Sequence, residues 1–135
     1  MDLEILIKLL LSIALSSIIG FEREKLHRGA GLRTHILVCL ASTIITIASL
    51  SVESPADPTR IAAAIVTGIG FIGAGTIIQF KGKILGITTA ASLFLISGIG
   101  IAVGLAQYFL AILSTIFGYI VLIEGIKLKA FFFKK

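Results

Sequence analysis

The chain has 135 residues, of which 57% are apolar and only 14% are charged, and its mean hydropathy is +1.11. A soluble domain usually carries about a quarter charged residues, so this composition excludes a soluble enzyme, a secreted domain and a disordered tail. The stretches 9–21, 36–52, 61–80 and 84–123 contain no charged residue, and a membrane-spanning helix needs about 20 mainly apolar residues. The sequence therefore predicts an all-α integral membrane protein.

Hydropathy divides the chain into a compact bundle of five transmembrane helices. The first three spans are predicted at 3–21, 35–52 and 59–80. No Lys or Arg precedes the first apolar run, so we expect it to remain as a span and not to be cleaved as a secretory signal. Residues 84–123 would form a helix of about 60 Å, twice the thickness of a bilayer core. A break at Gly104–Tyr108 gives the last two spans, 84–104 and 107–125.

Basic residues predict the orientation of these spans. The net charge is +5, and ten of the twelve Lys and Arg residues fall on one side of the predicted bundle: Arg23, Lys25, Arg28, Arg33, Lys81, Lys83, Lys127, Lys129, Lys134 and Lys135. Positive loops stay in the cytoplasm, so the N-terminus is expected outside and the C-terminus inside. The basic charge is a topology signal, and nucleic-acid binding is not expected. The chain is interpreted as one transmembrane domain, 1–135.

Small residues recur at helical spacing in the third and fourth spans. Residues 68–73 match the dinucleotide fingerprint G-x-G-x-x-G, but that motif requires a strand, a turn and water-accessible phosphates. We interpret these residues as packing residues, since small side chains let helices approach closely in lipid. The packing residues are Ala63, Thr67, Gly68, Gly70, Gly73, Ala74 and Gly75 in span three, and Gly86, Ala90, Ser97, Gly100 and Gly104 in span four.

Spans three and four are therefore expected to pack tightly together, or against a second copy. A separate row of isoleucines on span three is expected to face lipid or a looser contact: Ile61, Ile65, Ile69 and Ile72.

Asp57 precedes the third span and allows two interpretations. As the N-cap before Pro58, it places a carboxylate at the positive end of the helix, and Arg60 can reach it from the same side. As a hard oxygen ligand at the outer mouth, it can bind Mg²⁺. Capping is the favoured role, one carboxylate can serve both, and Asp57 is the metal-ligand candidate.

Charged residues also flank the first loop. Glu22 and Arg23 end the first span, and Arg33 and Thr34 enter the second. Mixed charges at a helix end usually form a solvated, self-paired surface. Glu22 and Arg33 nevertheless flank a tight, glycine-containing loop, so they can form a specific, partly buried pair or gate.

The remaining polar residues favour structural roles. His27 and His35 lack the ligand pattern of a zinc site and are interpreted as interfacial. Thr88 and Thr89 bond back to a helix more often than to an ion. Cys39 has no second cysteine with which to form a disulfide or a metal cluster.

No ionisable residue falls near the centre of a predicted span, so any ion route would use hydroxyls, Gln79, carbonyls or a subunit interface. No nucleophile and base are paired, and we therefore expect neither an enzyme nor a bound cofactor.

Five motifs occur in order along the chain: residues 20–23 (GFER), 30–35 (AGLRTH), 57–63 (DPTRIAA), 68–75 (GIGFIGAG) and 86–91 (GITTAA). This set resembles the transmembrane domain of the MgtC/SapB family of bacterial inner-membrane proteins, over about residues 3–123. The resemblance implies a role in magnesium homeostasis, in adaptation to low magnesium and, in some pathogens, in survival within macrophages. It also singles out Glu22, Arg23, Arg33, Asp57, Arg60 and the glycines of span three.

The resemblance leaves the mechanism open. Family members are often labelled Mg²⁺ transporters, whereas the best-studied member is described as a regulator that acts on the F-type ATP synthase. Others carry a C-terminal cytoplasmic domain of ACT-like fold, which is not expected in these 135 residues. The first hypothesis is a non-enzymatic regulator of another membrane complex. The alternative is a direct Mg²⁺ transporter or channel, as a homo-oligomer. A third option is a lipid- or stress-responsive component with no ion role.

Overall fold

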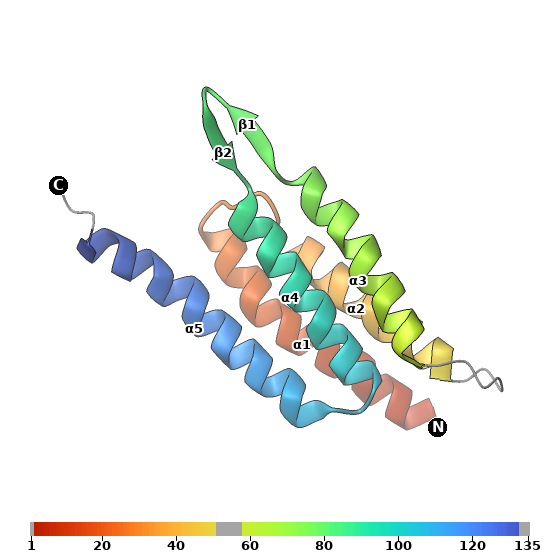
Figure 1. The fold of residues 1–135 in the computed structure, drawn as a ribbon. Coiled ribbons are helices and arrows are strands. Elements are labelled where there is room, and N and C mark those ends of the chain that lie inside the picture. The colour runs from red at the N-terminus through yellow and green to blue at the C-terminus, as the bar shows by residue number, and fades with distance from the viewer. Residues whose placement is uncertain (1, 51–57, 133–135) are drawn as a thin grey trace.

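The computed structural model describes residues 2–50 and 58–132, which form a helical bundle with one β-hairpin (Figure 1). The elements are α1 (Asp2–Lys25), α2 (Leu32–Leu50), α3 (Pro58–Gly75), β1 (Ile78–Phe80), β2 (Lys83–Leu85), α4 (Ile87–Gly104) and α5 (Tyr108–Phe132). The predicted all-α class is confirmed. Of the described helices, α1, α2 and α4 are long and apolar enough to cross a membrane, while the apolar stretches Arg60–Gly75 and Tyr108–Ile123 are shorter.

The break predicted within residues 84–123 is confirmed. Helix α4 ends at Gly104 and α5 begins at Tyr108. The Leu105 amide donates to Ile101 O, and the Gln107 amide donates to Ala102 O at 2.8 Å. These bonds close the last turn of α4 before the chain reverses its direction.

Helix α4 lies at the centre of the bundle. It contacts each of the other four helices, while α3 and α5 lie on opposite sides of it (Figure 1). The apolar core joins α1, α2, α4 and α5 and consists of Leu15, Ile19, Cys39, Ile96, Ile99, Ala102, Val103 and Ala111. Helix α3 contacts α4 and α2 and therefore forms one edge of the bundle.

Glycines on α4 bring it close to α2. A Cβ atom at Gly100 would collide with the Cys39 carbonyl oxygen, and one at Gly104 would lie 2.6 Å from Thr46 Cβ. Thr43 Oγ1 donates across the same contact to Gly100 O at 3.0 Å. The expected packing of spans three and four is confirmed, because α3 contacts α4 and Gly73 lies against Ala90, but Gly100 and Gly104 pack on α2 instead of on α3.

The face of α3 that packs inward also differs from the prediction. Ile69 is buried and clusters with Ala30 and Leu93, and Gly73 lies against Ala90. The row of Ala63, Thr67, Gly70 and Ala74 is exposed. The isoleucine face was expected to meet lipid or a looser contact. Ile69 packs inward, and Ile65 and Ile72 line an apolar pocket beside α2, which fits the looser contact, while the small residues point away.

The third helix is shorter than the predicted span 59–80. The Thr76 amide donates to Gly73 O and the Ile77 amide to Ala74 O at 3.0 Å each, which tightens the last turn and ends the helix at Gly75. Strands β1 and β2 follow and pair in antiparallel fashion. Lys81 and Gly82 have φ values of 48° and 75°, as required by the type I′ turn that joins short strands. Hydropathy alone could not distinguish the first strand, which belongs to the uncharged stretch 61–80, from a continued helix.

Gly86→Ala is expected to destabilise the protein more than Gly75→Ala. Gly86 has a φ of 91°, a conformation that costs an alanine about 1–2 kcal/mol, and a Cβ there would collide with the Thr76 carbonyl oxygen. A Cβ at Gly75 meets nothing within 4 Å. Thermal unfolding of both purified variants in one detergent measures the difference, and equal melting temperatures would contradict the prediction.

Candidate functional site

A buried arginine joins α1 to the start of α4. Arg23 is only 2% exposed, and its Nη2 donates to Thr89 Oγ1 at 3.3 Å. Its Nε has no hydrogen-bond partner. Both residues were candidates from the sequence, and the fold brings them together although they are far apart along the chain. A buried cation with incomplete hydrogen bonding is energetically costly, which is typical of a functional position.

A histidine on α2 meets the next turn of α4. His35 Nδ1 lies 2.8 Å from Gly31 O, and Nε2 lies 3.1 Å from Ser92 Oγ. A carbonyl oxygen only accepts, so Nδ1 carries a proton and donates. Ser92 Oγ also lies 2.8 Å from Thr89 O and has a single proton to give. Either neutral His35 accepts that proton, or a doubly protonated His35 donates to Ser92. The charge of His35 is thus coupled to the direction of the Ser92 hydroxyl.

Glu22 is the acidic member of this region. Its side chain is 8% exposed, and neither carboxylate oxygen has a hydrogen-bond partner. The neighbouring acid, Glu24, instead accepts the Leu32 amide at 2.7 Å and so caps α2. Gly31 permits this contact, because Glu24 Oε2 occupies the space that a Cβ at Gly31 would fill.

These residues form a polar cluster, defined here as Glu22, Arg23, His35, Thr89 and Ser92. Its members come from α1, α2 and α4. The described residues contain no group of three or more His, Cys, Asp or Glu side chains arranged for a metal.

Other residues predicted from the sequence lie outside this cluster. Arg33, Arg60 and Thr88 are exposed, and Thr34 is half-buried. The suggested Glu22–Arg33 pair is not formed, because Glu22 turns inward while Arg33 stays at the surface. Asp57, the metal-ligand candidate, lies outside the described residues.

The predicted packing glycines divide into two groups. Four of them lie against other parts of the chain: Gly73, Gly86, Gly100 and Gly104. At the other three, Gly68, Gly70 and Gly75, a Cβ atom would meet nothing within 4 Å. Gly100 and Gly104 form part of the α2–α4 contact, while the open glycines lie on α3.

Sequence reasoning missed the place of His35. It was interpreted as interfacial, but it is fully buried. The pattern of His35, Cys39, Ser42 and Thr46 at i, i+4, i+7 and i+11 places one small or polar face on α2, and all four residues are buried. That periodicity was the available signal.

The sequence profile of the MgtC family matches residues 9–131, almost the whole chain. This protein belongs to the MgtC family. The family is one of membrane proteins and is not a known enzyme family. No solved structure matches this MgtC-family chain significantly.

Three relatives illustrate the match. The chain is 40% identical over 130 residues to the putative magnesium transporter YhiD of Escherichia coli K12, covering 90% of this chain and 60% of that protein. It is 42% identical over 111 residues to protein MgtC of Salmonella typhimurium LT2, covering 82% and 48%. It is 38% identical over 119 residues to an uncharacterized protein of Haemophilus influenzae, covering 81% and 50%. The chain therefore spans about half to three-fifths of the length of these relatives.

Proposed function

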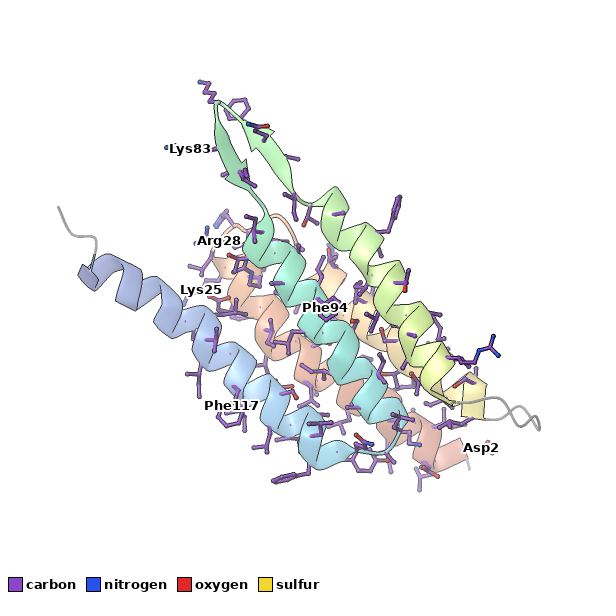
Figure 2. The ribbon with its side chains drawn as sticks, in the orientation of Figure 1. Asp2, Lys25, Arg28, Lys83, Phe94 and Phe117 are labelled. Atoms are coloured by element: carbon purple, nitrogen blue, oxygen red, sulfur yellow. The ribbon has the colours of Figure 1, made fainter. Side chains whose placement is uncertain are left out.

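We propose that this protein is a non-enzymatic component of magnesium homeostasis in the bacterial inner membrane, and that it acts by binding and regulating another membrane protein. Its membership of the MgtC family and the name of the YhiD relative support the magnesium role. Lys25, Arg28 and Lys83 lie at one end of the bundle and Asp2 at the other (Figure 2). This asymmetry supports a cytoplasmic position for the basic end.

The exposed small-residue face of α3 carries the regulatory part of the proposal. Four small residues share one side of α3 and are exposed: Ala63, Thr67, Gly70 and Ala74. Thr67 Oγ1 donates back to Ala63 O at 2.9 Å, so its hydroxyl is satisfied within α3 and presents no unpaired group to lipid.

Exposed faces elsewhere in the bundle have a different character. Large apolar side chains cover α1 and α5, as Leu10 and Phe117 illustrate with exposures of 57% and 62%. In lipid, hydrophobicity does not drive helices together, and close packing of small residues does. A helix of another protein can therefore approach the α3 backbone closely along this row of small residues, beside Phe71, which is 84% exposed.

The partner that fits this face is a transmembrane helix. In the proposed function it belongs to a foreign membrane complex, such as the F-type ATP synthase. A second copy of this chain is the other occupant to test, because a homo-oligomer can use the same face.

Gly70→Leu is expected to preserve the fold and to abolish function. Gly70 has open space around its Cβ position, so leucine fits within the protomer but keeps a partner helix away. Gly98→Leu is the matched control, because Gly98 is exposed on α4 and has equally open surroundings. Growth at limiting Mg²⁺ of a bacterium lacking its own MgtC-family protein, complemented with each variant, provides the readout. Full growth with Gly70→Leu would contradict the proposal.

Cross-linking then identifies what covers the face. A photoreactive amino acid at position 67 is expected to form a product with a different membrane protein, identified by mass spectrometry, while one at position 98 does not. A product containing only this chain would contradict binding to another protein and would indicate a homo-oligomer.

Direct transport of Mg²⁺ is the second candidate, and the observation that favours it is the buried, unpartnered carboxylate of Glu22. Mg²⁺ prefers hard oxygen ligands, and Glu22 supplies two of them at the end of α1. Proteoliposomes containing the purified protein test it, with a known transporter as positive control. Uptake that is lost in Glu22→Gln would favour transport, whereas no uptake beside a working control would favour regulation.

A further inference from the structure

The β-hairpin between α3 and α4 extends beyond the ends of both helices. Figure 1 shows strands β1 and β2 standing clear of α1 and α5. Within the described residues, the two strands pair with each other in a two-stranded sheet. Their register is Ile78 with Leu85, Gln79 with Ile84, and Phe80 with Lys83.

This register gives the hairpin two unlike faces. Directly paired residues lie on the same side of a sheet, and neighbours along a strand lie on opposite sides. One side therefore carries Ile78, Phe80, Lys83 and Leu85 and is called the Phe80 face. The other side carries Gln79 and Ile84. The Phe80 face contains three of the four apolar side chains in the strands, and its Lys83 lies beside the turn.

A hairpin of this kind needs a surface to cover it. Ile78, Phe80 and Leu85 are 56%, 59% and 47% exposed, and an isolated two-stranded hairpin is marginally stable at best in water. The hydrocarbon core does not suit it either, because the outer edges of the strands carry unpaired backbone groups that lipid tails cannot satisfy. The membrane interface meets both requirements, since it offers apolar contact on one side and hydrogen-bond partners on the other.

The position of the hairpin relative to α4 agrees with a place at the membrane interface. Helix α4, Ile87–Gly104, would measure about 27 Å at 1.5 Å per residue, close to the roughly 30 Å hydrocarbon core. The hairpin joins α4 through Gly86, so its base lies at the edge of that core. Strands of three residues extend about 10 Å, similar to the headgroup layer.

The positive charges on and near the hairpin indicate that the lipid it meets is anionic. Lys81 and Lys83 lie at and beside the turn, and Lys81 Nζ sits 5.3 Å from the centre of the Phe80 ring. Lys25 and Arg28 lie at the same end of the bundle as Lys83 (Figure 2). Lysines beside an aromatic ring are typical of the membrane interface, where the apolar parts bury and the ammonium groups reach the phosphates.

We propose that the Phe80 face of this hairpin lies on the membrane interface beside α3 and α4, where Lys81 and Lys83 bind anionic phospholipid headgroups. The interaction positions the α3–α4 connection on the bilayer. It is independent of the regulatory role, because it concerns the lipid that surrounds the protein and not a partner protein.

Single tryptophan reporters test this placement, because the natural sequence contains no tryptophan. Phe80→Trp reports on the Phe80 face and Ile84→Trp on the opposite face, and both positions are exposed. Each full-length variant is reconstituted in phosphatidylcholine vesicles with brominated acyl chains, with and without phosphatidylglycerol. The emission of Phe80→Trp is expected to shift to the blue and to lose more intensity to bromine than that of Ile84→Trp. Phosphatidylglycerol should increase the difference.

Two further variants complete the design. Phe117→Trp, on the exposed side of α5, should be quenched equally in both lipids and confirms reconstitution. Lys81→Gln with Lys83→Gln in the Phe80→Trp background should remove the effect of phosphatidylglycerol. Circular dichroism checks that each variant is folded.

Three outcomes would overturn the proposal. Water-like, unquenched emission from both hairpin positions would place the hairpin in the aqueous phase, where a protein partner would be its occupant. Equal quenching of the two positions would contradict the assignment of the Phe80 face. Quenching that does not respond to phosphatidylglycerol would contradict the role of the lysines.

Discussion

Gly100→Ala is expected to lower the free energy of unfolding by about 1–3 kcal/mol, the usual cost of overpacking a tight contact. The added Cβ would collide with the Cys39 carbonyl oxygen and would lie 2.8 Å from Ser42 Cβ. Backbone atoms cannot rotate away as the end of a side chain can, so α2 and α4 must separate. That movement would also weaken the 3.0 Å hydrogen bond from Thr43 to Gly100 O. Denaturation by sodium dodecyl sulfate, followed by circular dichroism, measures the change.

Gly98→Ala is the matched control for this prediction. Gly98 lies on the same helix, is exposed, and has no atom within 4 Å of its Cβ position. Alanine should stabilise the helix there by up to about 1 kcal/mol, because it is the better helix former. If both variants were equally stable, the close contact between α2 and α4 would not be important for the fold.

Arg23→Met is expected to abolish growth at limiting Mg²⁺ while leaving the protein as stable as the wild type, or more so. Arg23 is buried, its Nε has no hydrogen-bond partner, and it forms no ion pair within 4 Å with a described carboxylate, although the adjacent Glu22 interacts with it electrostatically. An apolar side chain of similar length removes the cost of desolvating that charge. The complementation assay measures function, and thermal unfolding in detergent measures stability.

Arg28→Met controls for the loss of one positive charge at the same end of the bundle, since Arg28 is exposed. We expect it to keep both function and stability. Unfolding of Arg23→Met would show that Arg23 is needed for the fold itself. Normal growth with Arg23→Met would show that the polar cluster is not part of the functional site.

The sequence predicted the helices well and their contacts only in part. Length required a helix break within residues 84–123, because one helix would be about twice as long as a bilayer core is thick. The glycine, amide and tyrosine of Gly104–Tyr108 indicated where it falls. The hairpin was missed, since its outer residues Ile78, Phe80, Ile84 and Leu85 belong to the uncharged stretches 61–80 and 84–123 that were assigned to spans three and four. The Lys81–Gly82 pair was a local sign of a tight turn, but it was interpreted only as a basic loop.

The candidate site was predicted in part. Glu22, Arg23 and Thr89 were named from the sequence, and the fold buries all three. Periodicity identifies which residues share a face of one helix, but it does not identify the neighbouring helix. The contact of His35 with Ser92 depends on how α2 and α4 cross, and it could not be predicted from either segment alone.

The sequence by itself determined that this is a helical membrane protein, where its chain reverses and which residues are small or charged. These properties follow from composition and from the thickness of a bilayer, and they require no knowledge of contacts. Only the tertiary structure decided which small face is buried. Because apolar side chains gain little by leaving lipid, burial in this bundle depends on the fit between helices. That fit places Gly100 of α4 against α2 and leaves Gly70 of α3 exposed.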